Sequence, residues 1–199
     1  MKLIPPNILL LLVTVFSFGQ EDWTLKKNGD SIKVFTRETN DLKLKEYKAI
    51  TYVDTFKENV LSVILDAKNI KDWNYKTSES YLIKKEGDSI HHVYMYNDMP
   101  WPVSNRDFIS KLTVKYPDEH SIKVLIEPGD SSLVPEKENV IRMKTFEGYW
   151  LIEEKNDLIK ITQQLYGNPE GNLPSFFINT AIVSAPFNTF LKLREVLSK

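Results

Sequence analysis

Apolar and polar residues alternate along most of the chain after residue 30, in short stretches separated by turn residues. Alternation with a period of two predicts β-strands, each with one apolar and one polar face. The strands are expected at 32–37, 44–53, 79–85, 89–97, 106–115, 121–127, 140–154 and 158–166. Because most turns between the later six are short, we expect these strands to be antiparallel neighbours.

Two segments between the second and third strands change to a helical period. Between residues 56 and 67, apolar side chains recur on one helical face, and Asp54 or Thr55 is the expected N-cap. A second, short helix is expected at 68–73.

The last segment, from about 173 to 197, is helical and apolar over much of its surface, with Pro186 expected to bend it. A helix that is apolar nearly all round is buried on several sides or covers something apolar besides the sheet. Helices segregated from an antiparallel sheet indicate an α+β class. We therefore expect a curved antiparallel sheet wrapped around this long terminal helix.

Composition and charge narrow the function classes. The 199 residues are 42% hydrophobic and 27% charged, which suits one globular domain with a sizeable core. The net charge of -1 provides no general attraction to nucleic acid, and no such partner is expected. The sequence has no cysteine, and its three histidines lack metal-binding spacing, so neither a disulfide framework nor a metal site is expected.

Residues 1–19 have the pattern of a secretory signal peptide. Lys2 precedes an apolar run from Ile8 to Phe16, and Ser17-Phe18-Gly19 supplies the small residues that a signal peptidase reads. The run is shorter than the roughly 20 residues of a membrane span, and an uncleaved membrane anchor is the alternative. We expect an exported, periplasmic protein in which residues 20–199 form a single domain.

The segment Met99-Pro100-Trp101-Pro102 is the most unusual part of the chain. Proline lacks an N–H group and fixes φ, so the segment predicts a rigid loop that carries a large aromatic side chain. Arg106 and Asp107 follow at the start of a strand, where adjacent side chains point to opposite faces. One charge is then expected inside, where it needs a partner. The combination predicts a lined pocket.

Three stretches resemble the START domain, the StAR-related lipid-transfer family. They are residues 100–108, the spacing Ile70-x-x-Trp73, and the terminal pattern Gly171-x-Leu173-Pro174-x-Phe176-x-x-Asn179, Ala185-Pro186 and Leu191-x-x-Arg194. The resemblance covers about residues 23–197. It implies the helix-grip fold, with an apolar tunnel between the sheet and the terminal helix that holds one lipid. The long N-terminal helix with which the family often begins is reduced here to about residues 21–27.

The resemblance also implies a function. Members of the family bind sterols, phospholipids or ceramides, without a cofactor and usually without catalysis, and the fold does not say which ligand is bound. We expect a monomer that binds and carries a sterol-like, phospholipid or fatty-acyl ligand and touches membranes transiently.

Two other functions are open. One is a helix-grip enzyme of the cyclase or aromatase type that acts on a hydrophobic substrate, with acid–base groups drawn from Glu79, His92, Tyr94 and Arg106. The other is an interaction module with a filled core.

A polar anchor is the first candidate part of the lipid site. The resemblance places Arg106 near the lipid head group and makes Glu79, six residues after Trp73, its partner. The alternative is a structural ion pair within the set Glu79, Arg106 and Asp107. Tyr94 and Tyr96 share a strand face, and their hydroxyls are candidates to bond the ligand.

A gate and a helix face complete the candidate site. Met99 and Trp101 are expected to close the tunnel, and Trp101 is suited to a membrane interface. The terminal helix is expected to line the tunnel with Phe176, Phe177, Asn179, Val183 and Phe187. The alternative for each of these residues is ordinary core packing.

Overall fold

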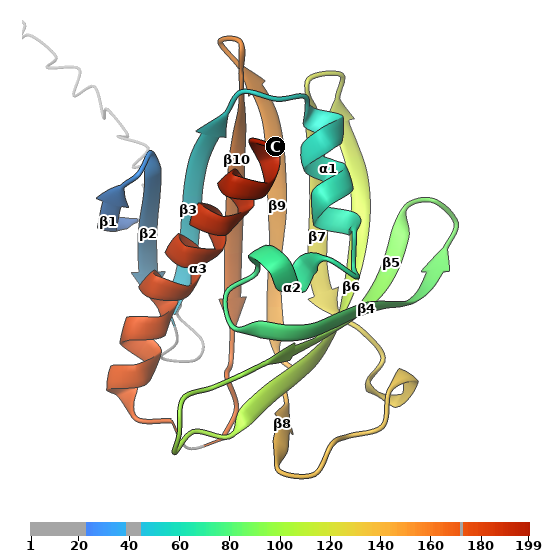
Figure 1. The fold of residues 1–199 in the computed structure, drawn as a ribbon, viewed down its shortest axis with the longest axis vertical. Coiled ribbons are helices and arrows are strands. Elements are labelled where there is room, and N and C mark those ends of the chain that lie inside the picture. Colours follow the sequence, from blue (N-terminus) through green and yellow to red (C-terminus); the bar gives the residue numbers. More distant parts are fainter. Residues whose placement is uncertain (1–22, 39–44, 172) are drawn as a thin grey trace, which may run out of the picture.

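A computed structural model describes residues 23–38, 45–171 and 173–199 of the protein (Figure 1). The predicted signal peptide lies outside these residues. In chain order the elements are β1 (Thr24–Gly29), β2 (Ile32–Glu38), β3 (Lys45–Val53), α1 (Lys57–Leu65), α2 (Ile70–Trp73), β4 (Thr77–Glu86), β5 (Ile90–Asn97), β6 (Asn105–Asp118), β7 (Ser121–Pro128), the short 3-10 helix η1 (Ser131–Leu133), β8 (Val140–Arg142), β9 (Phe146–Lys155), β10 (Leu158–Gly167) and α3 (Ser175–Leu197).

The strands of this described part form one ten-stranded sheet. Its order is β1-β2-β3-β10-β9-β7-β6-β5-β4, with antiparallel neighbours, and β8 pairs with β6 in parallel. Figure 1 shows α3 crossing the concave side of the sheet, with α1 and α2 on the same side. The expected α+β class and helix-grip fold are confirmed.

Three local expectations were wrong. Residues 24–29 form β1, which pairs with β2, rather than the remnant of a helix. The run 140–154 is two strands, because β8 pairs with the start of β6 while β9 lies between β7 and β10. Helix α1 has Phe56 as its N-cap residue, with no side-chain cap.

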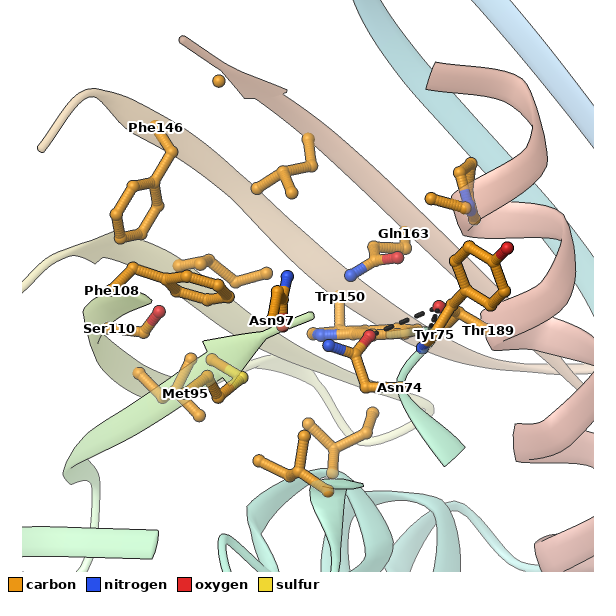
Figure 2. A pocket seen from close by; sticks show the side chains of 18 of the residues that line it. Asn74, Tyr75, Met95, Asn97, Phe108, Ser110, Phe146, Trp150, Gln163 and Thr189 are labelled. Carbon is orange, nitrogen blue, oxygen red and sulfur yellow. Dashed lines mark hydrogen bonds between the residues drawn. The ribbon is translucent and has the colours of Figure 1, made fainter. Parts of the chain in front are cut away.

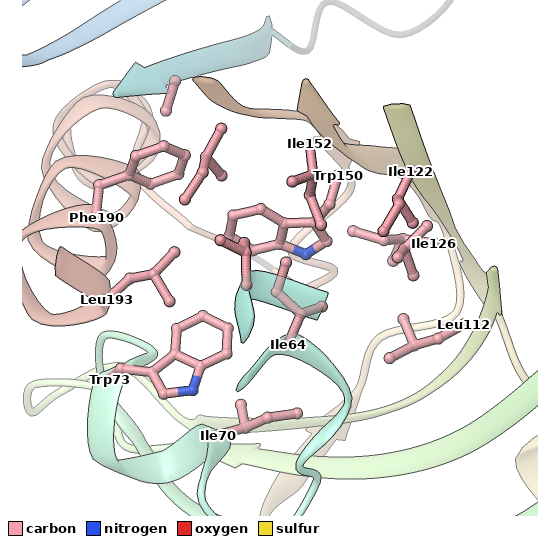
Figure 3. Close-up of a cluster of buried hydrophobic side chains, with 14 of the residues drawn as sticks. Ile64, Ile70, Trp73, Leu112, Ile122, Ile126, Trp150, Ile152, Phe190 and Leu193 are labelled. Atoms are coloured by element: carbon pink, nitrogen blue, oxygen red, sulfur yellow. The ribbon is translucent and has the colours of Figure 1, made fainter. Parts of the chain in front are cut away.

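Aromatic side chains fill the space between sheet and helices (Figure 3). Trp150 of β9 meets Trp73 of α2 edge to face, with ring centroids 5.9 Å apart, and stacks on Phe190 of α3 at 5.6 Å. Phe190 and Leu193 are fully buried, so the second half of α3 is held in the core. Arg194 adds polar bonds from the same half, since its Nη1 donates to Thr51 Oγ1 and to the carbonyl oxygen of Tyr52. No helix among the residues placed by the structure is long and apolar enough to cross a membrane.

Candidate functional site

A cavity of about 230 Å³ lies between the concave face of the sheet, α2 and the middle of α3 (Figure 2). Alternate residues of the central strands point into it, as the period-two pattern requires. Its walls include Met95 and Asn97 of β5, Phe108, Ser110 and Leu112 of β6, Phe146 and Trp150 of β9, Gln163 and Leu165 of β10, and Ala185, Pro186 and Thr189 of α3. No Asp, Glu, Lys or Arg of the described chain belongs to this lining.

A chain of hydrogen bonds runs along one wall and connects α3 to β5. The N–H of Tyr75 donates to Thr189 Oγ1 at 3.0 Å, and that hydroxyl donates to Asn74 Oδ1 at 3.3 Å. Asn74 Nδ2 donates to Thr77 Oγ1 at 2.8 Å, and Thr77 in turn donates to Asn97 Oδ1 at 2.8 Å. The chain starts at a backbone N–H, which can only donate, and ends at the side-chain oxygen Oδ1 of Asn97, which accepts from Thr77.

Gln163 is a further amide of the cavity lining and is almost completely buried. Its Oε1 accepts a hydrogen bond of 2.9 Å from the hydroxyl of Tyr47. Burial raises the pKa of Tyr47 well above its ordinary value, so this hydroxyl stays protonated and able to donate. Figure 2 shows Asn97 and Gln163 entering the cavity from different strands.

Two further polar atoms of lining residues lack partners among the residues described. Ser110 Oγ and Trp73 Nε1 are both buried and without a hydrogen bond. An unpaired buried polar group costs about 1–3 kcal/mol, so such atoms need an explanation in a folded protein. Their position beside the cavity indicates groups that are able to bond a ligand.

Tyr94 and Tyr96 lie on the face of β5 opposite to the cavity, which corrects the expectation that they bond the ligand. Met95 and Asn97 are the strand's cavity residues, and the intervening side chains therefore point outward. The hydroxyl of Tyr94 donates to Asp107 Oδ2 at 3.0 Å, and that of Tyr96 accepts from Asn105 Nδ2 at 2.7 Å. Burial and the nearby Asp107 raise the pKa of Tyr94 to about 12.

The predicted pair between Glu79 and Arg106 was also wrong. Glu79 Oε2 is 2.5 Å from Nζ of Lys137, and both side chains are partly exposed. Asp107 instead holds Arg142, with Nε–Oδ1 at 2.7 Å and Nη2–Oδ2 at 2.8 Å. The adjacent charges of β6 do point to opposite faces, and each has its own partners.

Arg106 is on the cavity-facing side of β6, two residues before Phe108, but its guanidinium binds backbone. Nε donates to the carbonyl oxygen of Pro169 at 3.2 Å, and Nη2 to that of Glu170 at 3.3 Å. Nη1 donates to the carbonyl oxygen of Ser104. Arg106 therefore joins the 98–104 loop to the segment before α3. Burial lowers the pKa of Arg106.

The predicted gate residues lie in the loop that Arg106 holds. Trp101 is 92% exposed, and Val103 N–H closes a turn by donating to the carbonyl oxygen of Pro100 at 3.0 Å. The N–H of Met99 donates to Asn105 Oδ1 at 2.8 Å. Neither Met99 nor Trp101 is among the residues around the cavity. Whether this loop moves stays a prediction.

The predicted helix residues do not line the cavity either. Phe176 is 72% exposed, Asn179 is exposed, and Phe177 is half-buried beside Phe176. Val183 packs against the core, and Phe187 is buried in it. The helix contributes Ala185, Pro186 and Thr189 to the cavity instead.

Sequence reasoning missed the polar residues of the cavity, although part of the signal was present. The alternation in 89–97 separates Met95 from its two tyrosine neighbours, so choosing the other face would have found it. On one face of a predicted strand Gln163 lies between Ile161 and Leu165, and an amide on an apolar face indicates a buried polar contact. In the part of the chain that the structure covers, no group of three His, Cys, Asp or Glu residues is placed to hold a metal ion.

Comparison with known proteins places this fold in a family. No family model matches the chain. An uncharacterised protein of Pseudomonas aeruginosa is 32% identical over 181 residues, which cover 90% of this chain and 88% of that protein. Human phosphatidylcholine transfer protein is 27% identical over 176 residues, which cover 86% of this chain and 81% of that protein. The crystal structure of a STAR-related lipid transfer protein fragment from Xanthomonas axonopodis has a TM-score of 0.82 and 29% identity, and the match covers 89% of this chain and 99% of that chain.

The curved sheet, the gripped terminal helix and the apolar cavity define a helix-grip protein. With these relatives along most of its length, the chain belongs to the START family, the StAR-related lipid-transfer family.

Proposed function

We propose that the chain binds a single lipid or other hydrophobic molecule in the cavity and carries it without catalysing a reaction. The observation that carries this proposal is the cavity itself, which is walled by aromatic and aliphatic side chains in a START-family fold. The phosphatidylcholine transfer protein among its relatives supports lipid transfer as the activity.

The energetics favour a carrier. Burying a methylene group contributes about 0.8 kcal/mol, so ten methylenes supply roughly 8 kcal/mol relative to water. That corresponds to affinity near the micromolar range before ordering costs are subtracted. A bilayer interior is equally apolar, so exchange between membrane and cavity is close to neutral. A protein of this kind shields a lipid during transit and releases it again.

Lipid uptake requires the cavity to enlarge. Its volume of about 230 Å³ is below the roughly 300–1,000 Å³ of typical ligand pockets. The second half of α3 is anchored by Phe190, Leu193 and Arg194, whereas Phe176 and Asn179 in the first half are exposed. The first half of α3 is therefore the wall that moves outward most easily.

One end of the molecule is suited to membrane contact. Figure 1 shows the β5–β6 loop and the start of α3 at the same end, and Arg106 joins them through Ser104 and Glu170. Trp101 and Phe176 are exposed there, and tryptophan favours the membrane interface. This end approaches the bilayer while the lipid exchanges.

The alternative of a cyclase-type enzyme loses its candidate acid–base groups. Glu79 pairs with Lys137 at the surface, and Tyr94 bonds Asp107 on the outer face. His92 has the same orientation along β5, and its Nε2 lies 3.1 Å from Glu86 Oε1. Within the chain described, none of the three lines the cavity. The proposed role is therefore binding rather than catalysis. We also propose that the protein is a monomer and is exported to the periplasm.

Native mass spectrometry of the protein, expressed with its own leader, tests the proposal directly. We expect one bound lipid per chain and transfer of lipid between donor and acceptor liposomes. Gln164→Met, at a residue that bonds Glu46 and Tyr149 away from the cavity, is the control and is expected to keep the bound lipid. A wild-type protein that carries no lipid and takes none up from liposomes would overturn the proposed function.

A further inference from the structure

The cavity presents two amide nitrogens, and the oxygen of each amide already accepts a hydrogen bond from the protein. Asn97 Oδ1 is occupied by Thr77, and Gln163 Oε1 is occupied by Tyr47. The Nδ2 of Asn97 and the Nε2 of Gln163 have no partner among the described residues, and Figure 2 shows both amide nitrogens directed toward the middle of the cavity. Ser110 Oγ adds a buried hydroxyl without a partner.

The orientation of Asn97 is set by the protein. The hydrogen-bond chain starts at the N–H of Tyr75, which has no alternative role, and it reaches Asn97 through Thr189, Asn74 and Thr77. The Thr77 hydroxyl accepts from Asn74 Nδ2 and donates its own proton to Asn97 Oδ1, so the Nδ2 of Asn97 is on the other side of the amide. The cavity therefore faces an amide donor at this position.

A formally charged group has no counter-charge inside the cavity. No acidic or basic side chain belongs to the lining of the described cavity, and burying an unpaired charge in apolar surroundings is very costly. Arg106 is the charged residue that the sequence predicted near the lipid head group. Its guanidinium donates to three backbone carbonyl oxygens instead. A phosphate or ammonium head group would meet neither an ion-pair partner nor a bulk-water environment here.

We propose that the cavity takes an uncharged lipid moiety with a carbonyl acceptor, such as an ester, a ketone or a quinone, held by Asn97 Nδ2 and Gln163 Nε2. This inference rests on the proposed lipid-binding function and names its ligand class. Apolar walls accept the chains, and the two amide donors give the cavity its selectivity, since a ligand without an acceptor leaves both donors unpaired.

A matched set of probes tests this selectivity. Phosphatidylcholine vesicles are loaded with equal amounts of dioctyl ketone, heptadecane and dioctylamine, which is protonated at neutral pH. The protein is mixed with the vesicles and separated from them, and its bound probes are quantified by mass spectrometry. We expect the ketone to be enriched over the alkane by about tenfold, because one hydrogen bond retained in an apolar site favours binding by about that factor. We expect the ammonium probe to be excluded.

Matched variants on β5 and β10 separate the loss of an amide donor from general damage to the fold. Gln163→Met and Asn97→Leu are each expected to bring the ketone-to-alkane ratio toward one. Gln164→Met is the control, because Gln164 bonds Glu46 and Tyr149, away from the cavity, and it should keep the wild-type ratio. If Gln163→Met does not fold, Asn97→Leu together with the infrared carbonyl band of ketone bound to wild type decides the question. That band is expected at lower frequency than in a hydrocarbon solvent.

The outcomes distinguish two failures. Equal binding of ketone and alkane, binding of the ammonium probe, or loading with intact phosphatidylcholine alone would overturn the ligand class and leave lipid binding in place. A protein that takes up no probe and no vesicle lipid would overturn the proposed function as well.

Discussion

Asp107 of β6 and Arg142 of β8 form a two-pronged ion pair in which both side chains are almost completely buried. Arg142 also donates to the carbonyl oxygens of Ser131, Val134 and Pro135. The hydrogen bond to Asp107 raises the pKa of Arg142, so the guanidinium stays charged. It therefore holds the segment between β7 and β8 against the outer face of the sheet.

Removing one member of this pair should be strongly destabilising. We expect Arg142→Met to lower the free energy of unfolding by about 3–5 kcal/mol, because the carboxylate of Asp107 stays buried without its partner. Urea unfolding measures the change. Glu79→Gln is the matched control for a partly exposed pair, and we expect it to cost less than about 1 kcal/mol. Similar losses for the two variants would contradict this account of Asp107 and Arg142.

Arg106 should control the two segments that it joins. In Arg106→Leu, the carbonyl oxygens of Ser104, Pro169 and Glu170 lose their donors, and a similar apolar volume remains. We expect faster hydrogen exchange in residues 98–104 and 168–171 and a stability loss of about 1–3 kcal/mol. Hydrogen-exchange mass spectrometry checks the first, and chemical unfolding the second. Unchanged exchange in both segments would show that the guanidinium does not hold them.

The four tryptophans allow a clean comparison of exposed and buried rings. Trp101→Ala should leave stability within about 0.5 kcal/mol of wild type, because the ring is exposed. It should slow lipid transfer between liposomes if the loop touches the bilayer. Trp73→Ala should instead cost about 3–5 kcal/mol, because it empties a core site next to Trp150. Liposome transfer assays and thermal unfolding measure these effects, and a large stability loss in Trp101→Ala would assign that ring to the core.

Two histidines should change stability with pH in opposite directions. Burial lowers the pKa of His91, and Lys85 lowers it further while Asp88 opposes the shift. The unfolded chain therefore binds this proton more readily, so the His91 contribution falls as the pH drops below about 6.5. The hydrogen bond to Glu154 raises the pKa of His120. Its contribution is present at low pH and is lost as the pH rises through the folded-state value.

Melting temperatures of the wild type and of each histidine variant between pH 5.5 and 8 measure both effects. Each histidine changes the number of protons bound on unfolding by about one at most. His91→Gln should flatten the decline toward acid pH relative to wild type. His120→Gln should steepen it, because it removes a group that favours folding when protonated. Parallel curves for His91→Gln and wild type would contradict the assignment of a buried neutral imidazole.

The alternation of apolar and polar residues was sufficient for most strands and for the two faces of β6. It was not sufficient for β5, where it separated Tyr94 and Tyr96 from Met95 correctly but did not tell which set faces the cavity. The reason is physical, because both faces of the first part of β5 are buried. Aromatic and charged neighbours, including Tyr81 and Lys137, cover the outer face.

The partners of the charged residues depended on contacts far apart in the chain. Glu79 meets Lys137 across 58 positions, and Asp107 meets Arg142 across 35. No local sequence pattern specifies these ion pairs. They depend on the path of the segment between β7 and β8 and on the parallel pairing of β8 with β6.

The sequence by itself determined the order of most elements, the α+β class, the family resemblance and the opposite orientation of Arg106 and Asp107, because these follow from residue periodicity and short motifs. The tertiary structure alone decided which face of each strand surrounds the cavity and where each charge is paired. It also decided that the cavity presents the amides of Asn97 and Gln163 rather than an ion pair. The cavity lining and the charge partners are set where strands far apart in the sequence and α3 come together. The residues that meet there are not neighbours in the chain, so no local pattern specifies their contacts.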